Sequence, residues 1–312
     1  MNQLPGLVDL QVNGYAGIDF TSPALSLDQV LKAAINLRQQ GTGLFCPTVV
    51  TAPWKVYTHI LPLLAQAKKI LDGLDHDVYA QISGIHLEGP FISTVDGARG
   101  VHNLSAIRPA SLPDFDALFD LSNGALRLLT LAPEIPGGLE LVCHAASLGI
   151  LVGLGHTLAS ADVVHAAAAA GARFSTHLGN GLPATIQRHH NPLWSQLADP
   201  RLHTMIITDG HHLPADFVKV VIAVKGKGRV IVTSDAAPPA GLPAGEYSFC
   251  GKIVHLDTGG KLYDPQTGYL AGSSANLRQC QAWLSGLGYS VSELACLCRD
   301  NALALLASIK PS

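Results

Sequence analysis

Charged residues are scarce in this sequence of 312 residues. Asp, Glu, Lys and Arg make up only 14% of it, and the formal net charge at pH 7 is −3. This balance provides neither the basic field that binds nucleic acid nor a polybasic patch for a membrane surface. Apolar residues reach 48%, which is ample for a large core. We therefore expect no nucleic-acid or membrane partner, and a surface that a partner subunit partly covers.

Features of membrane and exported proteins are absent as well. No run of about 18 apolar residues occurs, so no membrane span is expected. The opening residues, MNQLPGLVDLQ, have neither the basic region nor the apolar stretch of a signal peptide. Six cysteines are scattered without a CxxC pair, and Cys296 and Cys298 lie in an apolar helical run that favours core packing over metal binding. Together these features indicate a cytoplasmic location.

Three common catalytic and phosphate-binding motifs are also missing. There is no GxSxG, which argues against a serine nucleophile. There is no GxxxxGK[ST] loop, and the GxG at residues 153–155 lacks both the third glycine and the acidic partner of a dinucleotide site. The chemistry must therefore come from other residues.

Short apolar runs alternate with helical segments along most of the chain. We expect strands at residues 7–12, 44–50, 80–87, 126–131, 150–154, 173–176, 204–208 and 229–233. Helices are expected at residues 26–40, 53–71, 111–121, 138–148, 160–170 and 214–225. This α/β pattern favours a (β/α)8 barrel of the TIM type over an open sheet, forming one catalytic domain over residues 1–312. Alternating aromatics predict a small hairpin insertion at 241–258, and closing helices are expected at 273–287 and 292–309.

Polar residues follow the predicted strands, and four of them suggest a metal-dependent hydrolase. His156 and His177 follow the strands at 150–154 and 173–176, Glu88 follows 80–87, and Asp235 follows 229–233. Any one of them could simply cap a helix or satisfy a turn, but histidine is a poor capping residue. In a barrel these ends meet at one rim. Glu88, His156 and His177 suit one divalent metal, which we expect to be Zn²⁺, and Asp235 suits a general base in amide or ester hydrolysis.

Other histidines carry weaker signals. His86 precedes Glu88 by two residues and is expected on the same strand face, behind the metal ligands. His102 and His212 lie in loops and are candidates for the substrate pocket. Arg188 is interpreted as an ordinary surface cation unless the substrate is anionic, because a guanidinium binds phosphate in a bidentate manner.

The chain resembles the N-acetylglucosamine-6-phosphate deacetylase family of the amidohydrolase superfamily. The matching segments cover most of it in order: PGLVDLQVNGYAGIDF, PTVVT, GIHLEGPFIS, TLAPE, GHTLAS, THLGNGLP, DGHHLPADFVK, VTSDAAPPAG and LAGSSANL. The resemblance implies removal of an acetyl group from an N-acetyl amino-sugar phosphate by a homodimer. It implies Glu88, His156 and His177 as metal ligands and Asp235 as the catalytic acid/base. Around the sugar phosphate it places His212, Asn180, Gly181, His102 and Arg188, with the arginine coming from a neighbouring subunit.

Departures from the family pattern leave alternatives open. Gln11 and Asn13 stand where much of the superfamily has His-x-His, as in single-metal deacetylases, so one metal ion is expected. The small β-sandwich usual in the family is not expected, because the first strand begins at residue 7. The loop around Arg188 does not match closely. An amidohydrolase acting on an unphosphorylated or other N-acyl amino sugar, or on a cyclic amide, therefore stays an alternative, as does a non-catalytic sugar-binding barrel.

Overall fold

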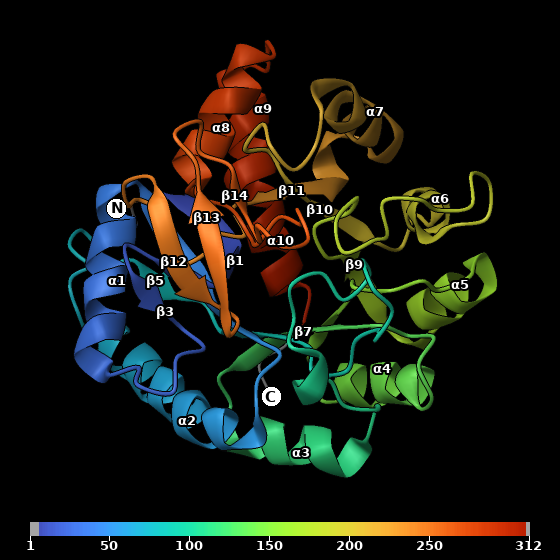
Figure 1. Cartoon of the computed structure of the whole chain (residues 1–312), viewed down its shortest axis with the longest axis horizontal. Coiled ribbons are helices and arrows are strands. Elements are labelled where there is room, and N and C mark those ends of the chain that lie inside the picture. Colours follow the sequence, from blue (N-terminus) through green and yellow to red (C-terminus); the bar gives the residue numbers. More distant parts are fainter. Residues whose placement is uncertain (1–5, 310–312) are drawn as a thin grey trace.

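A computed structural model describes residues 6–309 as a parallel barrel surrounded by helices (Figure 1). Its eight strands are hydrogen-bonded in the order β1-β4-β6-β7-β8-β9-β10-β11. Their bounds are β1 Leu7–Val12, β4 Thr42–Val50, β6 Ile85–Glu88, β7 Leu126–Leu131, β8 Leu151–Leu154, β9 Ala172–Ser175, β10 His203–Ile207 and β11 Val230–Thr233. The ring is nearly closed by residues just beyond β11, since the Asp235 amide donates to the Gln11 carbonyl at 3.0 Å and Val12 pairs with Ala236. The predicted barrel is confirmed.

Helices form the outer layer, and local sequence explains where several of them begin. They are α1 Leu27–Gln39, α2 Trp54–Leu71, α3 Leu112–Leu121, α4 Gly138–Ser147, α5 Ala161–Ala170, α6 Pro192–Ala198, α7 Ala215–Lys225 and α8 Leu277–Gly286. Ser26 and Asn276 make reciprocal capping boxes with Gln29 and Gln279, and the Ser160 hydroxyl caps α5. Within residues 6–309 no helix is both long enough and apolar enough to cross a membrane.

The barrel interior is filled by apolar side chains and sealed at its amino end by the last helix. After α9 (Val291–Ala295), a π-helical segment (Cys296–Asp300) leads into α10 (Asn301–Ala307). Leu305 of α10 packs with inward-facing side chains of seven strands, which are Val8, Leu10, Cys46, Leu128, Leu151, Phe174, Met205 and Ile231. Gly153 leaves room for the Phe174 ring, which would lie only 2.2 Å from a β-carbon there.

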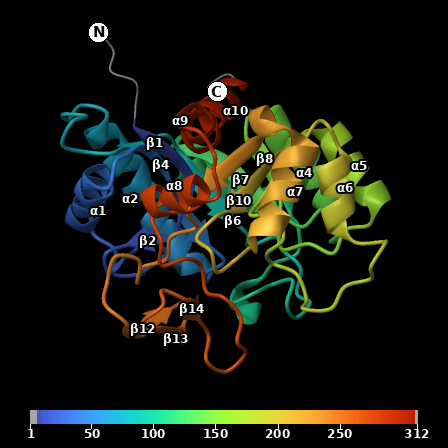
Figure 2. The ribbon, with the colours of Figure 1, turned by 90° about the horizontal axis from the view of Figure 1, so that it is seen from above.

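The predicted hairpin insertion is present and has a third strand. It contains β12 Gly245–Phe249, β13 Lys252–Leu256 and β14 Leu262–Tyr263, paired antiparallel. The insertion continues to Leu270, which bridges back to Tyr263. Phe249, Val254 and Leu262 form a small core with Val101 from the segment after β6. Figure 2 shows this sheet at the end of the barrel away from α9 and α10. The insertion therefore covers the end where the predicted site residues lie.

Several short elements differ from the sequence expectation. The strand expected at 80–87 is two pieces, β5 (Gln81–Ile82) and β6, because Gly84 takes φ +158° between them. Helix α6 lies in a segment interpreted as loop, and β2 (Gly14–Tyr15) with β3 (Ile18–Asp19) forms a small unpredicted hairpin. The 3-10 turns η1 (Leu104–Ala106) and η2 (Lys227–Arg229) were also unpredicted. These pieces are too short for a periodic pattern to reveal.

Candidate metal centre

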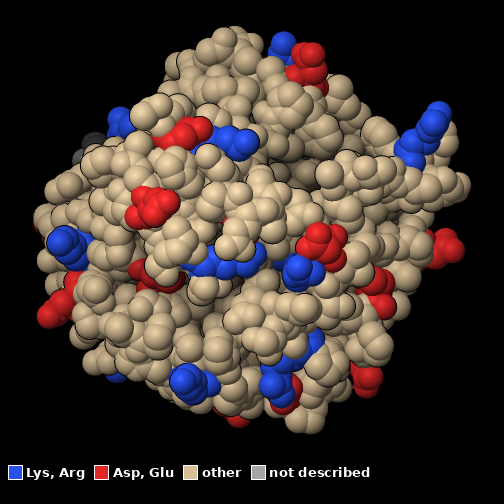
Figure 3. Space-filling view, in the orientation of Figure 1, with Lys and Arg blue, Asp and Glu red and all other residues tan. Residues whose placement is uncertain are grey.

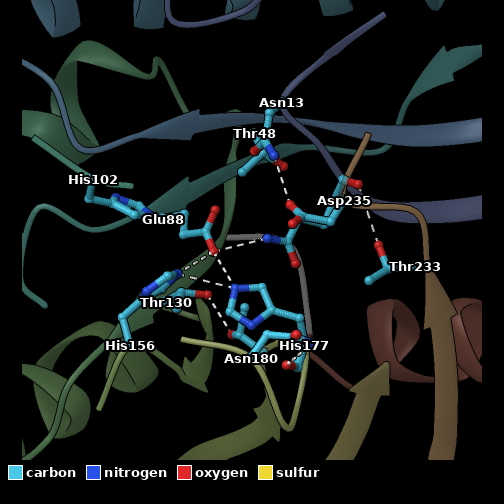
Figure 4. A network of polar contacts seen from close by, with 12 residues as sticks. Asn13, Thr48, Glu88, His102, Thr130, His156, His177, Asn180, Thr233 and Asp235 are labelled. Carbon is cyan, nitrogen blue, oxygen red and sulfur yellow. Dashed lines mark hydrogen bonds and ion pairs between the residues drawn. The ribbon is translucent and has the colours of Figure 1, made fainter. Parts of the chain in front are cut away.

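Glu88, His156 and His177 meet at the carboxyl end of the barrel, as the sequence predicts (Figure 4). Glu88 is the last residue of β6, and the two histidines follow β8 and β9 by two residues each. Glu88 Oε1 lies 3.2 Å from His156 Nε2 and 2.8 Å from His177 Nε2, and the two Nε2 atoms are 3.2 Å apart. All three residues are buried. One carboxylate oxygen and two imidazole nitrogens thus converge on one point.

The surrounding hydrogen bonds suit a metal-binding role. The His156 Nδ1–H donates to the Ala98 carbonyl at 2.8 Å, so Nε2 is the ring nitrogen that faces Glu88. Gln11 Nε2 donates to Glu88 Oε1 at 2.9 Å. Burial alone would raise the pKa of Glu88, but the hydrogen bonds from His156 and His177 outweigh it and hold that pKa well below its usual value. An ionised carboxylate with two imidazoles is a ligand set that suits Zn²⁺ and leaves a coordination position open.

Three residues at this site adopt a strained backbone. His156, His177 and Asp235 have φ values of +51°, +29° and +51°. Residues other than glycine seldom adopt these left-handed backbone angles, and such strained residues are concentrated at functional sites in proteins. Each residue lies where the chain turns from a strand into a loop, so the unusual φ turns each side chain back over the barrel.

Asp235 lies beside the ligand cluster and is held by Asn13. Asn13 Nδ2 donates to Asp235 Oδ1 at 2.7 Å, and the Ser273 amide donates to the Asp235 carbonyl at 2.9 Å. Burial, together with the negative charge of Glu88, raises the pKa of Asp235 to about 7. A carboxylate with this pKa can both take up and release a proton near neutral pH.

A cavity of about 180 Å³ opens beside these residues. His102 and His212 line it, as do Asn180 and Gly181, so the structure brings four further predicted residues to the site. The ring of His102 packs edge-on against that of His156, with centroids 4.4 Å apart. Burial and the nearby His156 lower the pKa of His102 to about 3, so this ring is neutral at physiological pH. Phe249 and Tyr269 of the insertion form part of the wall.

Asp209 is a functional candidate that sequence reasoning overlooked. It accepts from the Nδ1 of His212 at 2.8 Å and from the Ser273 hydroxyl at 2.7 Å, and its other oxygen accepts the amides of His211 and His212. These bonds orient His212 with its Nε2 free of Asp209. The sequence DGHH could have indicated this role. An aspartate often accepts hydrogen bonds from backbone amides two or three residues further along the chain.

Two predicted residues are placed differently from the rest. Arg188 is exposed in the loop before α6, and it is not among the residues that line the cavity of its own subunit. Its contribution to a neighbouring site therefore stays a prediction. His86 is buried inside the barrel and bonds to the Leu10 carbonyl and the Thr130 hydroxyl, with no described hydrogen bond to a ligand residue. It supports the barrel interior beneath the cluster.

This combination defines a class of protein. A TIM-type barrel with a Glu–His–His set and an acidic residue at the carboxyl ends of its strands is the architecture of a metal-dependent hydrolase. No family model matches the chain. It is 33% identical over 299 residues to the N-acetylglucosamine-6-phosphate deacetylase of Bos taurus, covering 92% of this chain and 70% of that protein. The chain belongs to the N-acetylglucosamine-6-phosphate deacetylase family.

Other relatives agree with this assignment. An N-acetylgalactosamine-6-phosphate deacetylase of Escherichia coli O157:H7 is 31% identical, with 88% of this chain and 69% of that one covered. The crystal structure of the Mycobacterium smegmatis N-acetyl-D-glucosamine-6-phosphate deacetylase superposes with a TM-score of 0.88 at 26% identity, covering 97% of this chain and 78% of that one. A variant of that enzyme was solved in complex with N-acetyl-D-glucosamine-6-phosphate. The family predicted from the motifs is thereby confirmed.

Proposed function

We propose that this protein is a Zn²⁺-dependent deacetylase that converts N-acetylglucosamine 6-phosphate, or a close N-acetyl amino-sugar phosphate, to acetate and the amino-sugar phosphate. The observation that carries this proposal is the convergence of Glu88, His156 and His177 beside Asp235 in one cavity. Membership of the deacetylase family supports the reaction type. The small sugar substrate fits a concave site rather than an extended surface.

In the proposed reaction, Glu88, His156 and His177 would hold one metal ion, and Gln11 and Ala98 orient Glu88 and His156. When bound, the metal polarises the acetyl carbonyl and lowers the pKa of a water molecule. Asp235 takes a proton from the attacking water and delivers it to the amide nitrogen as the C–N bond breaks. Asn13 keeps the carboxylate directed at the reacting groups through its bond to Oδ1. His212, His102, Asn180 and Gly181 are proposed to contact the sugar.

We further propose that the protein is a homodimer in the cytoplasm and that residues 1–312 act as one catalytic domain. The six cysteines are all free, as in a reducing compartment. The surface is poor in charge, and Figure 3 shows wide uncharged areas between scattered charged side chains on one face. Such a surface is compatible with a subunit interface.

An unphosphorylated N-acyl amino sugar is a second candidate substrate, because no Lys or Arg is among the described residues that line the cavity. The decisive experiment compares N-acetylglucosamine and N-acetylgalactosamine, each with and without the 6-phosphate, by acetate release from the metal-loaded protein. We expect kcat/KM to be at least about a hundredfold higher for a phosphorylated sugar, since a charge-assisted phosphate contact contributes several kcal/mol. Equal values for both forms would exclude phosphate recognition, and no turnover of any amide would overturn the deacetylase proposal.

Replacing the proposed acid/base tests the reaction itself. Asp235→Asn keeps the Oδ1 acceptor for Asn13, and asparagine tolerates a positive φ, so the fold and the metal content should persist. We expect kcat to fall by about 10³-fold or more, because both proton transfers are lost. Metal analysis by mass spectrometry and acetate release measure the two effects separately. Near-normal turnover would refute the role of Asp235, and a wild-type protein without stoichiometric metal would favour a sugar-binding barrel.

A further inference from the structure

His156 is held in place by a loop that follows β6 rather than by the strand that carries it. The carbonyl of Ala98 accepts the His156 Nδ1–H at 2.8 Å, and the Ser93 amide donates to the His156 carbonyl at 3.0 Å. Ala98 is fully buried. Because a carbonyl can only accept, its position decides which ring nitrogen carries the proton and which faces Glu88. The geometry of this ligand therefore depends on the placement of residues 93–102, which we call the Ala98 loop.

The Ala98 loop is tied together by Arg99 and Asp96. Arg99 Nη2 donates to Asp96 Oδ1 at 2.7 Å, and Arg99 Nη1 donates to the Thr94 carbonyl at 3.2 Å. The Asp96 side chain is nevertheless 64% exposed, so little packing restrains this edge of the loop. The two ends of the loop are anchored elsewhere, by the Ser93 amide on the His156 carbonyl and by His102 Nδ1, which lies 2.9 Å from the Thr51 hydroxyl. The exposed edge at Asp96 is not held by these two contacts.

The insertion supplies an external contact at this exposed edge of the loop. The Tyr269 hydroxyl donates to Asp96 Oδ2 at 2.9 Å, so the Asp96 carboxylate is bonded by Arg99 on one oxygen and by Tyr269 on the other. Tyr269 is itself anchored, because its carbonyl accepts from the Asp264 amide at 2.9 Å. Val101, at the far end of the loop, packs into the small core of the insertion. In Figure 2 the insertion and the chain after β6 lie at the same end of the barrel.

We propose that Tyr269 is a positioning residue that sets the metal-binding geometry of His156 from the insertion. Its hydroxyl fixes Asp96, Asp96 and Arg99 fix the Ala98 loop, and the Ala98 carbonyl fixes the imidazole with Nε2 toward Glu88 and His177. This inference deepens the proposed function and rests on it, since it requires the three ligand residues to bind a metal ion. The insertion would then act on metal affinity without touching the metal.

Tyr269→Phe removes only the hydroxyl and is the central test. The metal-free protein is titrated with Zn²⁺ against a competing chelator, and the visible spectrum of the Co²⁺-loaded protein reports the ligand geometry. We expect Zn²⁺ to bind about three- to tenfold more weakly, below the effect seen when a direct partner of a ligand is removed. The matched control is Tyr247→Phe, which removes another phenol of the insertion that donates to the Pro243 carbonyl and does not bond the loop. It should leave affinity and spectrum unchanged.

Variants of Asp96 test whether Tyr269 acts on His156 through Asp96 and the Ala98 loop. Asp96→Ala should match Tyr269→Phe, and the double variant should be no weaker than Asp96→Ala alone, because both changes break one chain of contacts. Asp96→Asn can still accept from Arg99 and donate to Tyr269, so it should restore most of the affinity. Wild-type affinity and an unchanged Co²⁺ spectrum in Tyr269→Phe would overturn the inference while leaving the proposed function intact. A wild-type protein that binds no Zn²⁺ would instead defeat the proposed function.

Discussion

At the scale of single residues, the strained positions and the chemical positions coincide. His156, His177 and Asp235 combine a positive φ with a place in the ligand cluster or beside it. Each such residue costs about 1–3 kcal/mol, which the surrounding hydrogen bonds must offset. The Ser93 amide on the His156 carbonyl and the Ser273 amide on the Asp235 carbonyl are two of those bonds. The site is therefore stabilised by backbone contacts from loops distant in sequence.

Gly181 provides space for His156, and its replacement should weaken metal binding. A β-carbon at Gly181 would lie 2.9 Å from His156 Nδ1, and the residue has φ +62°. We expect Gly181→Ala to displace the imidazole and reduce Zn²⁺ affinity about tenfold or more. The control is Gly124→Ala, where φ is +77° and nothing lies within 4 Å, so only backbone strain is added. Equal metal affinity in both variants would contradict a steric role for Gly181.

Asp19 should make stability depend on pH in a predictable direction. Burial raises the pKa of Asp19 from 3.8 to about 6, and the hydrogen bond from the Thr21 amide offsets part of that rise. The raised pKa means that ionisation is harder in the folded state, so stability falls as pH rises from about 4 to 6 and the loss is complete above 6. Asp19→Asn should therefore raise the free energy of unfolding by about 1–2 kcal/mol at pH 7.5 and by nothing at pH 4. Urea unfolding at both pH values measures this, and a gain at pH 4 equal to that at pH 7.5 would contradict it.

At the scale of secondary structure, the strands carry the proposed ligands and the loops orient them. Glu88 ends β6, and the histidines follow β8 and β9 closely. The hydrogen-bonded parallel strands therefore fix the distances between the backbones of these three residues. The partners that orient them come from elsewhere: Gln11 lies on β1 and Ala98 lies in a loop. The barrel therefore sets the positions of the three ligand residues. The hydrogen bonds from neighbouring segments orient the Glu88 carboxylate and the His156 ring.

Helix α10 should contribute to stability without affecting the site. Leu305 is 2% exposed and packs against barrel-lining side chains at the amino end, away from the ligand cluster. Leu305→Ala should cost about 2–4 kcal/mol of unfolding free energy, because a buried cavity is created. Leu306→Ala, at a partly buried position of the same helix, should cost less. Metal content should be unchanged in both, and loss of metal from folded Leu305→Ala would contradict this division of roles.

Much of the barrel and the central cluster could be predicted because each leaves a local signal. Strands buried on both faces are apolar runs, and His156, His177 and Glu88 stand directly at the ends of such runs. Ala98 and Tyr269 could not be predicted, because one acts through a backbone carbonyl and the other through a contact 173 residues away in sequence. Neither contact alters residue periodicity. Helix α6, with seven residues, is too short to display one.

At the scale of the whole molecule, the two ends of the barrel have separate tasks. The amino end is closed by α10 and apolar packing, whereas the carboxyl end gathers the strained residues, the buried charges and the insertion. This division places the chemistry where strands, loops and insertion meet. It also leaves the exposed loop before α6, with Arg188, outside the cavity of its own subunit. We therefore propose that this arginine acts at the site of another subunit.

Subunit mixing tests whether Arg188 acts across a dimer. Arg188→Ala should raise KM for a phosphorylated sugar about tenfold or more, with little change for the unphosphorylated one, because a guanidinium–phosphate contact is lost. Asp235→Asn removes the acid/base from the site of the subunit that carries the substitution, so that site is inactive. If Arg188 serves the neighbouring site, a hybrid of the two variants has one intact site, formed by the Asp235 of one subunit and the Arg188 of the other.

Random assembly of equal amounts makes about half of all dimers hybrids, so about a quarter of wild-type activity should return at low substrate concentration. The parent homodimers, mixed without exchange of subunits, provide the baseline. If Arg188 acted only within its own subunit, every hybrid would hold one site with the alanine and one with the asparagine. Activity would then stay at the parental average, and the dimeric role of Arg188 would be refuted.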